Sequence, residues 1–164
     1  MVIELDLDIS ALEGAAANIA ATTMNFVTFK AGAAGDDVTT TSTNKIVTIS
    51  TDSTTASDIE GADIIVLGGN TYANNAAALD AMEANGDRTI THTNNFSADD
   101  SFFFVYSNST TGDVTLAAAN VSSADNHASG TATFSAGLLE GIDLAGLDGV
   151  TDLSSLVLAN IDIV

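Results

Sequence analysis

Two pairs of adjacent aspartates are the residues whose type and spacing could do chemistry in this chain. Asp36 and Asp37 lie in a loop-like stretch rich in glycine and threonine, and Asp99 and Asp100 follow asparagine, serine and alanine. Hard oxygen ligands in turns are what calcium requires, so we predict Ca²⁺ at these pairs. Neither pair has the spacing of an EF-hand loop, and the alternative is that the carboxylates cap turns or are simply solvated.

A third acidic group has the same two interpretations. Asp143, Asp148 and Asp152 lie close together in the sequence near the carboxyl-terminal end. The chain carries 22 acidic and only 3 basic residues, for a formal net charge of -19. A weak calcium requirement spread over several sites would relieve that self-repulsion.

The sequence contains no clear motif of a catalytic site. The two histidines are His92, on an expected strand, and His127, in a polar loop, and serine and aspartate are abundant everywhere. The chain has no cysteine nucleophile and no Gly-x-Ser-x-Gly elbow. Turnover would require a cleft that joins one of these histidines to nearby carboxylates. We therefore predict that the protein is not an enzyme.

Composition narrows the class of protein further. A surface with so few cations cannot displace counterions from nucleic acid, and anionic membranes would repel it. The hydrophobic content of 46% and the mean hydropathy of +0.29 argue against a disordered chain. No apolar run approaches the ~20 residues of a membrane span. The first eight residues lack the basic start of a cleaved signal peptide. We expect no nucleic acid partner and no membrane insertion.

The pattern along the chain predicts mostly strands. The segment Ser101–Tyr106 is too apolar for a half-exposed strand, so we expect it in the centre of a sheet, covered on both faces and forming a hairpin with residues 113–117. A helix is expected over Asn75–Asn85, with Asn74 as its N-cap and Gly86 after its end, and a weaker one over residues 11–21. Alternation of apolar and polar residues predicts further strands at residues 2–9, 24–30, 45–50, 63–67, 88–93 and 131–134.

These elements predict the fold class. We expect a single β-rich domain over residues 1–164: mainly antiparallel β, a sandwich or a barrel-like sheet, with one or two short helices. One face of the expected strand 88–93 would carry Thr89, Thr91 and Thr93, which could form a flat ice- or sugar-binding surface, although an ordinary exposed strand face is the simpler interpretation.

Several segments from Asn44 onward carry a resemblance to a known family. They include the segments 58–67, 71–76 and 103–108, the stretch Leu147–Leu153 and the tail Asp162–Val164. In these segments the chain resembles the C-terminal region of RTX-like bacterial proteins exported by type I secretion. The resemblance implies an uncleaved secretion signal within residues 135–164, recognition by a type I ABC exporter, and an extracellular or cell-surface location. The calcium-binding nonapeptides of that family are missing, because only Gly68-Gly69-Asn70 is similar to them.

Both ends of the chain have strand-like segments, at Val2–Leu5 and Leu156–Leu158. Each could complete its own sheet in a monomer, or add to the open edge of a neighbouring copy. The predicted function is a secreted structural subunit that self-assembles into a surface filament or surface layer, by exchange of terminal strands and with the help of calcium. The alternative is a secreted carbohydrate- or surface-ligand-binding module of an RTX-like adhesin.

Overall fold

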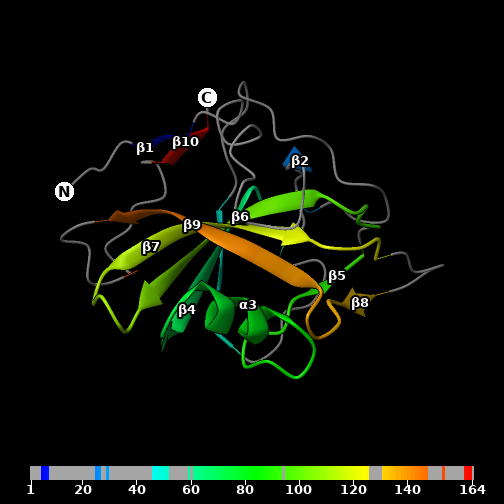
Figure 1. The fold of residues 1–164 in the computed structure, drawn as a ribbon, viewed down its shortest axis with the longest axis horizontal. Helices are drawn as coiled ribbons and strands as arrows, with labels where there is room; N and C mark the ends of the chain where they lie inside the picture. The colour runs from blue at the N-terminus through cyan, green and yellow to red at the C-terminus, as the bar shows by residue number, and fades with distance from the viewer. Residues whose placement is uncertain are drawn as a thin grey trace.

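The computed structural model describes ten strands and one helix, α3. It describes residues 5–7, 25–26, 29, 46–51, 59, 61–93, 95–125, 131–147, 153 and 161–163. The elements are β1 Leu5–Leu7, β2 Asn25–Phe26, β3 Ile46–Ile49, β4 Ile64–Tyr72, α3 Asn75–Met82, β5 Thr91–His92, β6 Asp100–Asn108, β7 Val114–Val121, β8 Ala132–Thr133, β9 Leu139–Leu147 and β10 Ile161–Ile163 (Figure 1). The expectation of a mainly β fold with a short helix is confirmed.

A six-stranded sheet forms the body of the described residues. Its order is β3-β4-β6-β7-β9, with β2 paired to β6 beside this path. The pairs β6–β7 and β7–β9 are antiparallel, as expected, whereas β2, β3 and β4 all run parallel to their partners. The sheet is therefore mixed, because β4 returns to β6 through a crossover and not through a hairpin.

Helix α3 lies in that crossover and packs on the sheet over β9 and β4 (Figure 1). It begins where the sequence predicts, because the Asn74 side chain accepts a hydrogen bond from the Ala77 N–H. It ends at Met82, three residues before the expected Asn85, because Glu83 is already extended. No helix in the described ranges has the length and apolar character that crossing a bilayer requires.

Strand β6 is buried on both faces, which confirms the expectation for Ser101–Tyr106. Phe102, Phe104 and Tyr106 face the core under α3, while Phe103 and Val105 on the opposite face are also fully buried. Strand β7 forms the predicted hairpin with β6 and pairs with it from Ser101↔Asn120 to Ser107↔Val114. This double burial makes β6 and β7 the centre of the hydrophobic core.

Two irregularities interrupt the regular pairing. In β4, residues Gly68, Gly69 and Asn70 have no opposite residues on β6, although the strand continues to Tyr72. The strand predicted at residues 63–67 therefore continues past the glycines to Tyr72. In β9, the register with β7 shifts so that Leu144 is the extra residue. Both irregularities are β-bulges, which change the direction in which neighbouring side chains point.

Two small sheets complete the described elements. The expected strand 88–93 is reduced to β5, which pairs antiparallel with β8. The first and last strands, β1 and β10, pair in parallel and lie side by side (Figure 1). The expected helix over 11–21 lies outside the described residues.

Candidate functional site

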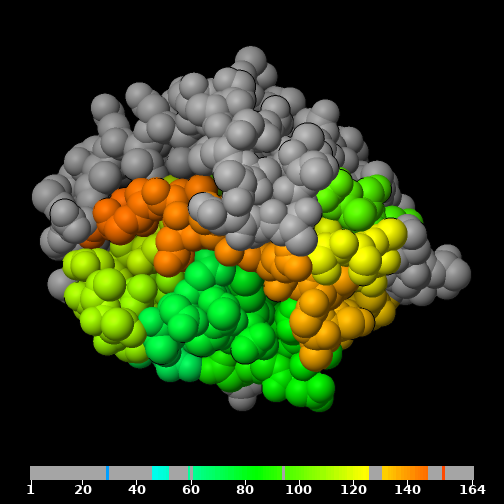
Figure 2. All heavy atoms as spheres, in the orientation of Figure 1, coloured from blue at the N-terminus to red at the C-terminus, as the bar shows by residue number. Residues whose placement is uncertain are grey.

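A groove lies between α3 and the edge strand β9, with a volume of about 400 Å³. Figure 2 shows the green atoms of the helix region beside the orange atoms of β9 on the surface of the molecule. The groove is lined by polar and small side chains over a floor that includes two leucines: Asn74, Asn75, Ala76, Leu79, Asp80, Leu139, Glu140, Gly141 and Asp143. A volume of this size suits a small organic ligand, since ligand pockets span ~300–1,000 Å³.

Asp143 is held in the groove by two side-chain hydrogen bonds. Its Oδ1 accepts a hydrogen bond from the Tyr106 hydroxyl at 3.0 Å and another from the Asn75 side-chain amide at 3.1 Å. Tyr106 is fully buried, and the Asn108 amide lies 3.5 Å from its hydroxyl. Because both bonds end on one oxygen, Oδ2 remains available at the groove, where the carboxylate is exposed.

Local features of the sequence place these groups together. The bulge at Leu144 aligns Asp143 with Ala117, whose side chain faces the core under α3. Gly141 allows the helix to approach, because a Cβ there would lie 2.7 Å from the Asn75 Oδ1 and 2.9 Å from a Leu79 methyl. The Asn74 cap fixes where α3 begins, and so places Asn75 opposite β9.

The tyrosine that holds Asp143 stays protonated over a wide pH range. Burial is the main cause that raises the pKa of Tyr106, and the negative charge of Asp143 raises it further. The other tyrosine of the chain is Tyr72, and its ring lies 6.5 Å from that of Tyr106. Burial, together with the charge of Asp87, raises the pKa of Tyr72 to about 12. Both phenols therefore act as hydrogen-bond donors at neutral pH.

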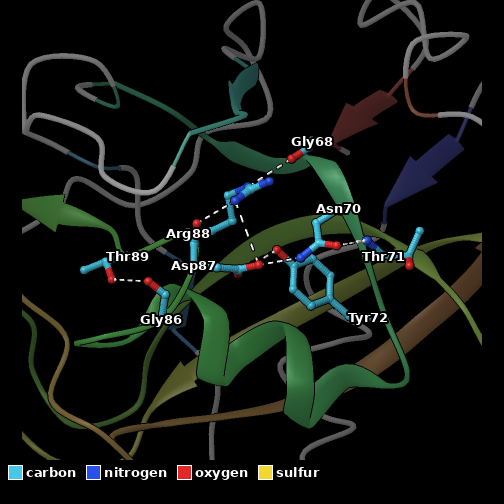
Figure 3. Close-up of polar contacts among 8 residues, drawn as sticks. All are labelled: Gly68, Asn70, Thr71, Tyr72, Gly86, Asp87, Arg88 and Thr89. Atoms are coloured by element: carbon cyan, nitrogen blue, oxygen red, sulfur yellow. Dashed lines mark hydrogen bonds and ion pairs between the residues drawn. The ribbon is translucent and has the colours of Figure 1, made fainter.

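A second polar cluster joins β4 to the segment after α3 (Figure 3). Asp87 accepts hydrogen bonds from the Tyr72 hydroxyl at 3.1 Å and from the Asn70 amide. The Arg88 guanidinium is buried and donates to the carbonyls of Gly68 at 3.0 Å and Asp87 at 2.6 Å. The partners in all of these hydrogen bonds are groups of the protein. The cluster therefore stabilises the β4 bulge.

The end of the helix is fastened to β9 by Glu83, which is buried. One carboxylate oxygen of Glu83 accepts the Gly137 N–H at 2.6 Å, and the other accepts the Leu139 N–H at 2.7 Å. Charge-assisted bonds of this kind are stronger than neutral ones. Together with the Asn75–Asp143 bond, they hold both ends of α3 against β9 and fix the width of the groove.

Three of the aspartates predicted to bind calcium lie in the described residues, and of these Asp143 lines the groove whereas Asp99 and Asp100 do not. Asp100 is buried, and its Oδ2 accepts the Ser97 N–H at 2.8 Å, which is a turn-capping bond. Asp99 is half-buried, with a backbone φ of 73°. Within the described ranges, no three histidine or acidic side chains are grouped so that they could hold one metal ion. Four other predicted ligands lie outside those ranges: Asp36, Asp37, Asp148 and Asp152. Calcium binding stays a prediction.

His92 lies close to the carboxylate of Asp125, but the histidine is buried in the core. His92 is 1% exposed and its Nε2 lies 3.3 Å from the Asp125 Oδ2. Its ring packs against Phe96 and Phe134, at centroid distances of 5.0 and 4.4 Å. This packing is typical of a core histidine. His127 lies outside the described residues.

The threonine face is reduced to a short ladder. Thr91 pairs with Thr133 across β5 and β8, which share two residue pairs. Thr133 is exposed and Thr91 is half-buried. A flat binding surface needs a longer ladder than these described strands provide.

Sequence reasoning singled out Asp143 but missed its partners. Asn75 is 68 residues away from Asp143 and Tyr106 is 37 residues away. We assigned Asn75 to the helix and Tyr106 to the core, and neither assignment signals a shared site. The one available signal was the glycine at position 141, which marks a close approach in a strand.

No family model, curated protein or solved structure matches the chain. The resemblance to the C-terminal region of RTX-like proteins therefore stays a prediction.

Proposed function

We propose that the protein is a non-enzymatic, extracellular surface module that binds a saccharide in the groove between α3 and β9. The observation that carries this proposal is the carboxylate of Asp143, which is held by Tyr106 and Asn75 and has one oxygen free. Sugar hydroxyls are recognised by fixed acceptors and donors of this type. Binding to such a group loses less conformational entropy than binding to a mobile surface carboxylate.

The charge of the groove defines the class of saccharide. Asp80, Glu140 and Asp143 all line it, and the chain as a whole carries -19 charges. The chain has three basic residues, of which Arg88 is buried elsewhere and Lys30 and Lys45 lie outside the described residues. A cleft lined by one sign of charge concentrates ligands of the opposite sign. The proposed ligand is therefore a neutral or an amino sugar, because these carboxylates repel an acidic polysaccharide.

A binding assay with matched variants tests this function. The wild-type protein is applied to a glycan array, and the affinity for the best neutral or amino sugar is measured by calorimetry. We expect Asp143→Asn to lower the affinity by ~10-fold or more, since a hydrogen bond to a charged group contributes ~1.5–3 kcal/mol.

The control is Asp113→Asn, which removes the same charge from the residue before β7, away from the groove lining. It should leave the affinity unchanged. The proposal fails if the wild-type protein binds no sugar of this class, or if Asp143→Asn binds as tightly as the wild type.

Export by a type I system is part of the same proposal, because a surface module must leave the cell. It rests on the resemblance of the C-terminal segments. A chain that ends at Leu147 keeps β9 but lacks most of the predicted signal at residues 135–164. Expressed beside a type I exporter, this chain should remain inside the cell while the full chain reaches the medium. Equal amounts of both chains in the medium would refute this route.

A further inference from the structure

We infer that copies of this chain join by exchanging the partner of β1 and β10, so that β10 of one copy pairs with β1 of the next. This inference goes beyond the binding groove and does not depend on it. It rests on one observation: the first and last described strands pair with each other in parallel, through Leu5↔Ile161, Asp6↔Asp162 and Leu7↔Ile163.

The size of this sheet makes its opening easy. It has two strands of three residues each, and within the described residues it is a separate sheet from the six-stranded one. A two-stranded sheet of this size is marginal in water. Each of its few hydrogen bonds contributes only ~0.5–1.5 kcal/mol net. Opening the pair breaks none of the strand pairings that β6 and β7 make in the described structure.

Exchange reforms the same contacts between copies. Since β1 and β10 come from opposite ends of the chain, an open pair offers one free strand of each kind (Figure 1). A second copy supplies the complementary strand in the same register, so no new interface has to evolve. This is the low-cost route of domain swapping, and it gives an open chain of copies or a closed ring.

Charge sets the conditions under which exchange occurs. Two copies of net charge -19 repel each other, which favours the closed monomer at low salt. Salt or Ca²⁺ screens this repulsion, because the Debye length falls from ~30 Å at 0.01 M ionic strength to ~8 Å at 0.15 M. Exchange therefore increases with protein concentration and with added salt.

Engineered cysteines test the pairing directly, because the chain has no cysteine of its own. The full chain carrying both Asp6→Cys and Asp162→Cys is oxidised at rising protein concentration and separated on a non-reducing gel. Paired strands lie ~4.8 Å apart, and disulfides form at Cα separations of ~4.4–6.8 Å. We expect cyclised monomer at low concentration and a ladder of disulfide-linked multimers at high concentration and at 0.15 M ionic strength.

A mixing experiment identifies the partner strand. One chain carries only Asp6→Cys and the other only Asp162→Cys, and both are incubated together before oxidation. Exchange predicts a mixed dimer in several-fold excess over dimers of either single variant. The control mixes Asp6→Cys with Thr111→Cys, since Thr111 is exposed in the turn between β6 and β7. This mixture should give only the background of random collisions.

The results separate this inference from the groove function. If the double variant gives cyclised monomer alone at every concentration, and no mixed dimer forms, copies do not exchange strands. If the mixed dimer is no more abundant than the Thr111→Cys control, the inference also fails. Sugar binding by a monomer would survive either result, because it requires only α3 and β9.

Discussion

Two strand pairs of this molecule, β6–β7 and β1–β10, are joined by the same kind of backbone hydrogen bonds but differ in length and in the sheet to which they belong. The pair β6–β7 joins seven residue pairs, and its strands are buried almost throughout. The pair β1–β10 joins three residue pairs in a two-stranded sheet. Hydrogen bonds alone do not make a strand pair permanent, since their net contribution is small. The β6–β7 pair is also held by the large apolar area that its two strands remove from water.

The two strand pairs are assigned different roles: β6–β7 stabilises the fold, and β1–β10 is proposed to join copies. The core around β6 holds the groove, because Tyr106 and Asn75 reach Asp143 only when β6, α3 and β9 are all packed. The β1–β10 pair forms a separate sheet within the described residues, and in the exchange proposed above it changes partners while this core stays packed. Under the two proposals, ligand binding and the joining of copies occur at separate places, and neither process disturbs the other.

The strongest test of the comparison is a proline in the central ladder. Ala118 lies in β7, is fully buried and pairs with Phe103 on β6 and with Ile142 on β9. In Ala118→Pro the ring removes a backbone donor from the middle of a sheet, where proline is otherwise found only on edge strands or at bulges. Since domains of this size are stable by only ~5–15 kcal/mol, we expect a large fall in the urea midpoint. The measurement is the circular dichroism spectrum and the urea midpoint.

A wild-type midpoint for Ala118→Pro would mean that β7 does not lie in the centre of a sheet. A small residue that keeps its N–H is the control at the same position. Ala118→Gly should fold, with a loss of ~1 kcal/mol from the added backbone freedom of a strand glycine.

A middle-sized effect is expected where the helix meets β9. In Glu83→Gln, one of the two carboxylate oxygens becomes an amide NH₂ that faces the N–H of Gly137 or Leu139. Leaving one buried donor unpaired costs ~1–3 kcal/mol, measured as a loss of unfolding free energy in urea. The control is Asp80→Asn on the exposed side of α3, which should change it by less than ~0.5 kcal/mol. Equal losses for both variants would mean that Glu83 does not fasten the helix.

The two tyrosines predict a loss of stability at alkaline pH. The ordinary pKa of a tyrosine is 10.0, and in the folded protein that of Tyr72 rises to about 12. Between these values the unfolded chain releases protons that the folded chain keeps, so the unfolding free energy falls as pH rises from 10 toward 12. The pKa of Tyr106 rises for the same reasons, and extends the loss in the same direction.

The measurement is the urea midpoint against pH, followed together with tyrosinate absorbance. Because the chain has only two tyrosines, the variant with Tyr72→Phe and Tyr106→Phe isolates their contribution. Its unfolding free energy should change less between pH 10 and 12 than that of the wild type. An equal fall in both proteins would assign the alkaline loss to other groups.

The sequence was most informative for features that depend on residues within a single strand or helix. The apolar run Ser101–Tyr106 predicted a doubly buried strand, and Asn74 predicted the first residue of α3, because burial and capping are local in the sequence. The parallel direction of β3 and β4 could not be predicted in this way. Alternation indicates which face of a strand is buried and says nothing of the direction of its neighbour.

The candidate site was less predictable for a related reason. Arg88 was assigned to a strand of six residues, yet its guanidinium binds the Gly68 carbonyl and the strand shrinks to β5. Gly68–Asn70 looked like the end of a strand, but they form a bulge that supplies this carbonyl. Contacts of this kind depend on residues 20 positions apart. Neither the type of a residue nor the spacing of apolar residues along a strand indicates such a distant contact.

The smallest effect completes the comparison, with a proline in the terminal ladder. Asp6→Pro removes one backbone donor from β1, which pairs only with β10 in the described structure. Because that ladder is short, we expect the urea midpoint of the core to change by less than the equivalent of ~1 kcal/mol. A proline in β7 is expected to lower the midpoint far more, so the two variants compare a proline in the central ladder with one in the terminal ladder.

Asp6→Pro should prevent assembly, although it changes the stability of the core only slightly. At high protein concentration and 0.15 M ionic strength, Asp6→Pro should remain monomeric by size-exclusion chromatography, while the wild-type protein forms larger species. A large fall in the urea midpoint would show that β1 belongs to the core and cannot be exchanged without unfolding. Unchanged assembly would show that copies join through another surface. Only a variant that is both stable and monomeric supports a division between a fixed core and an exchangeable terminal pair.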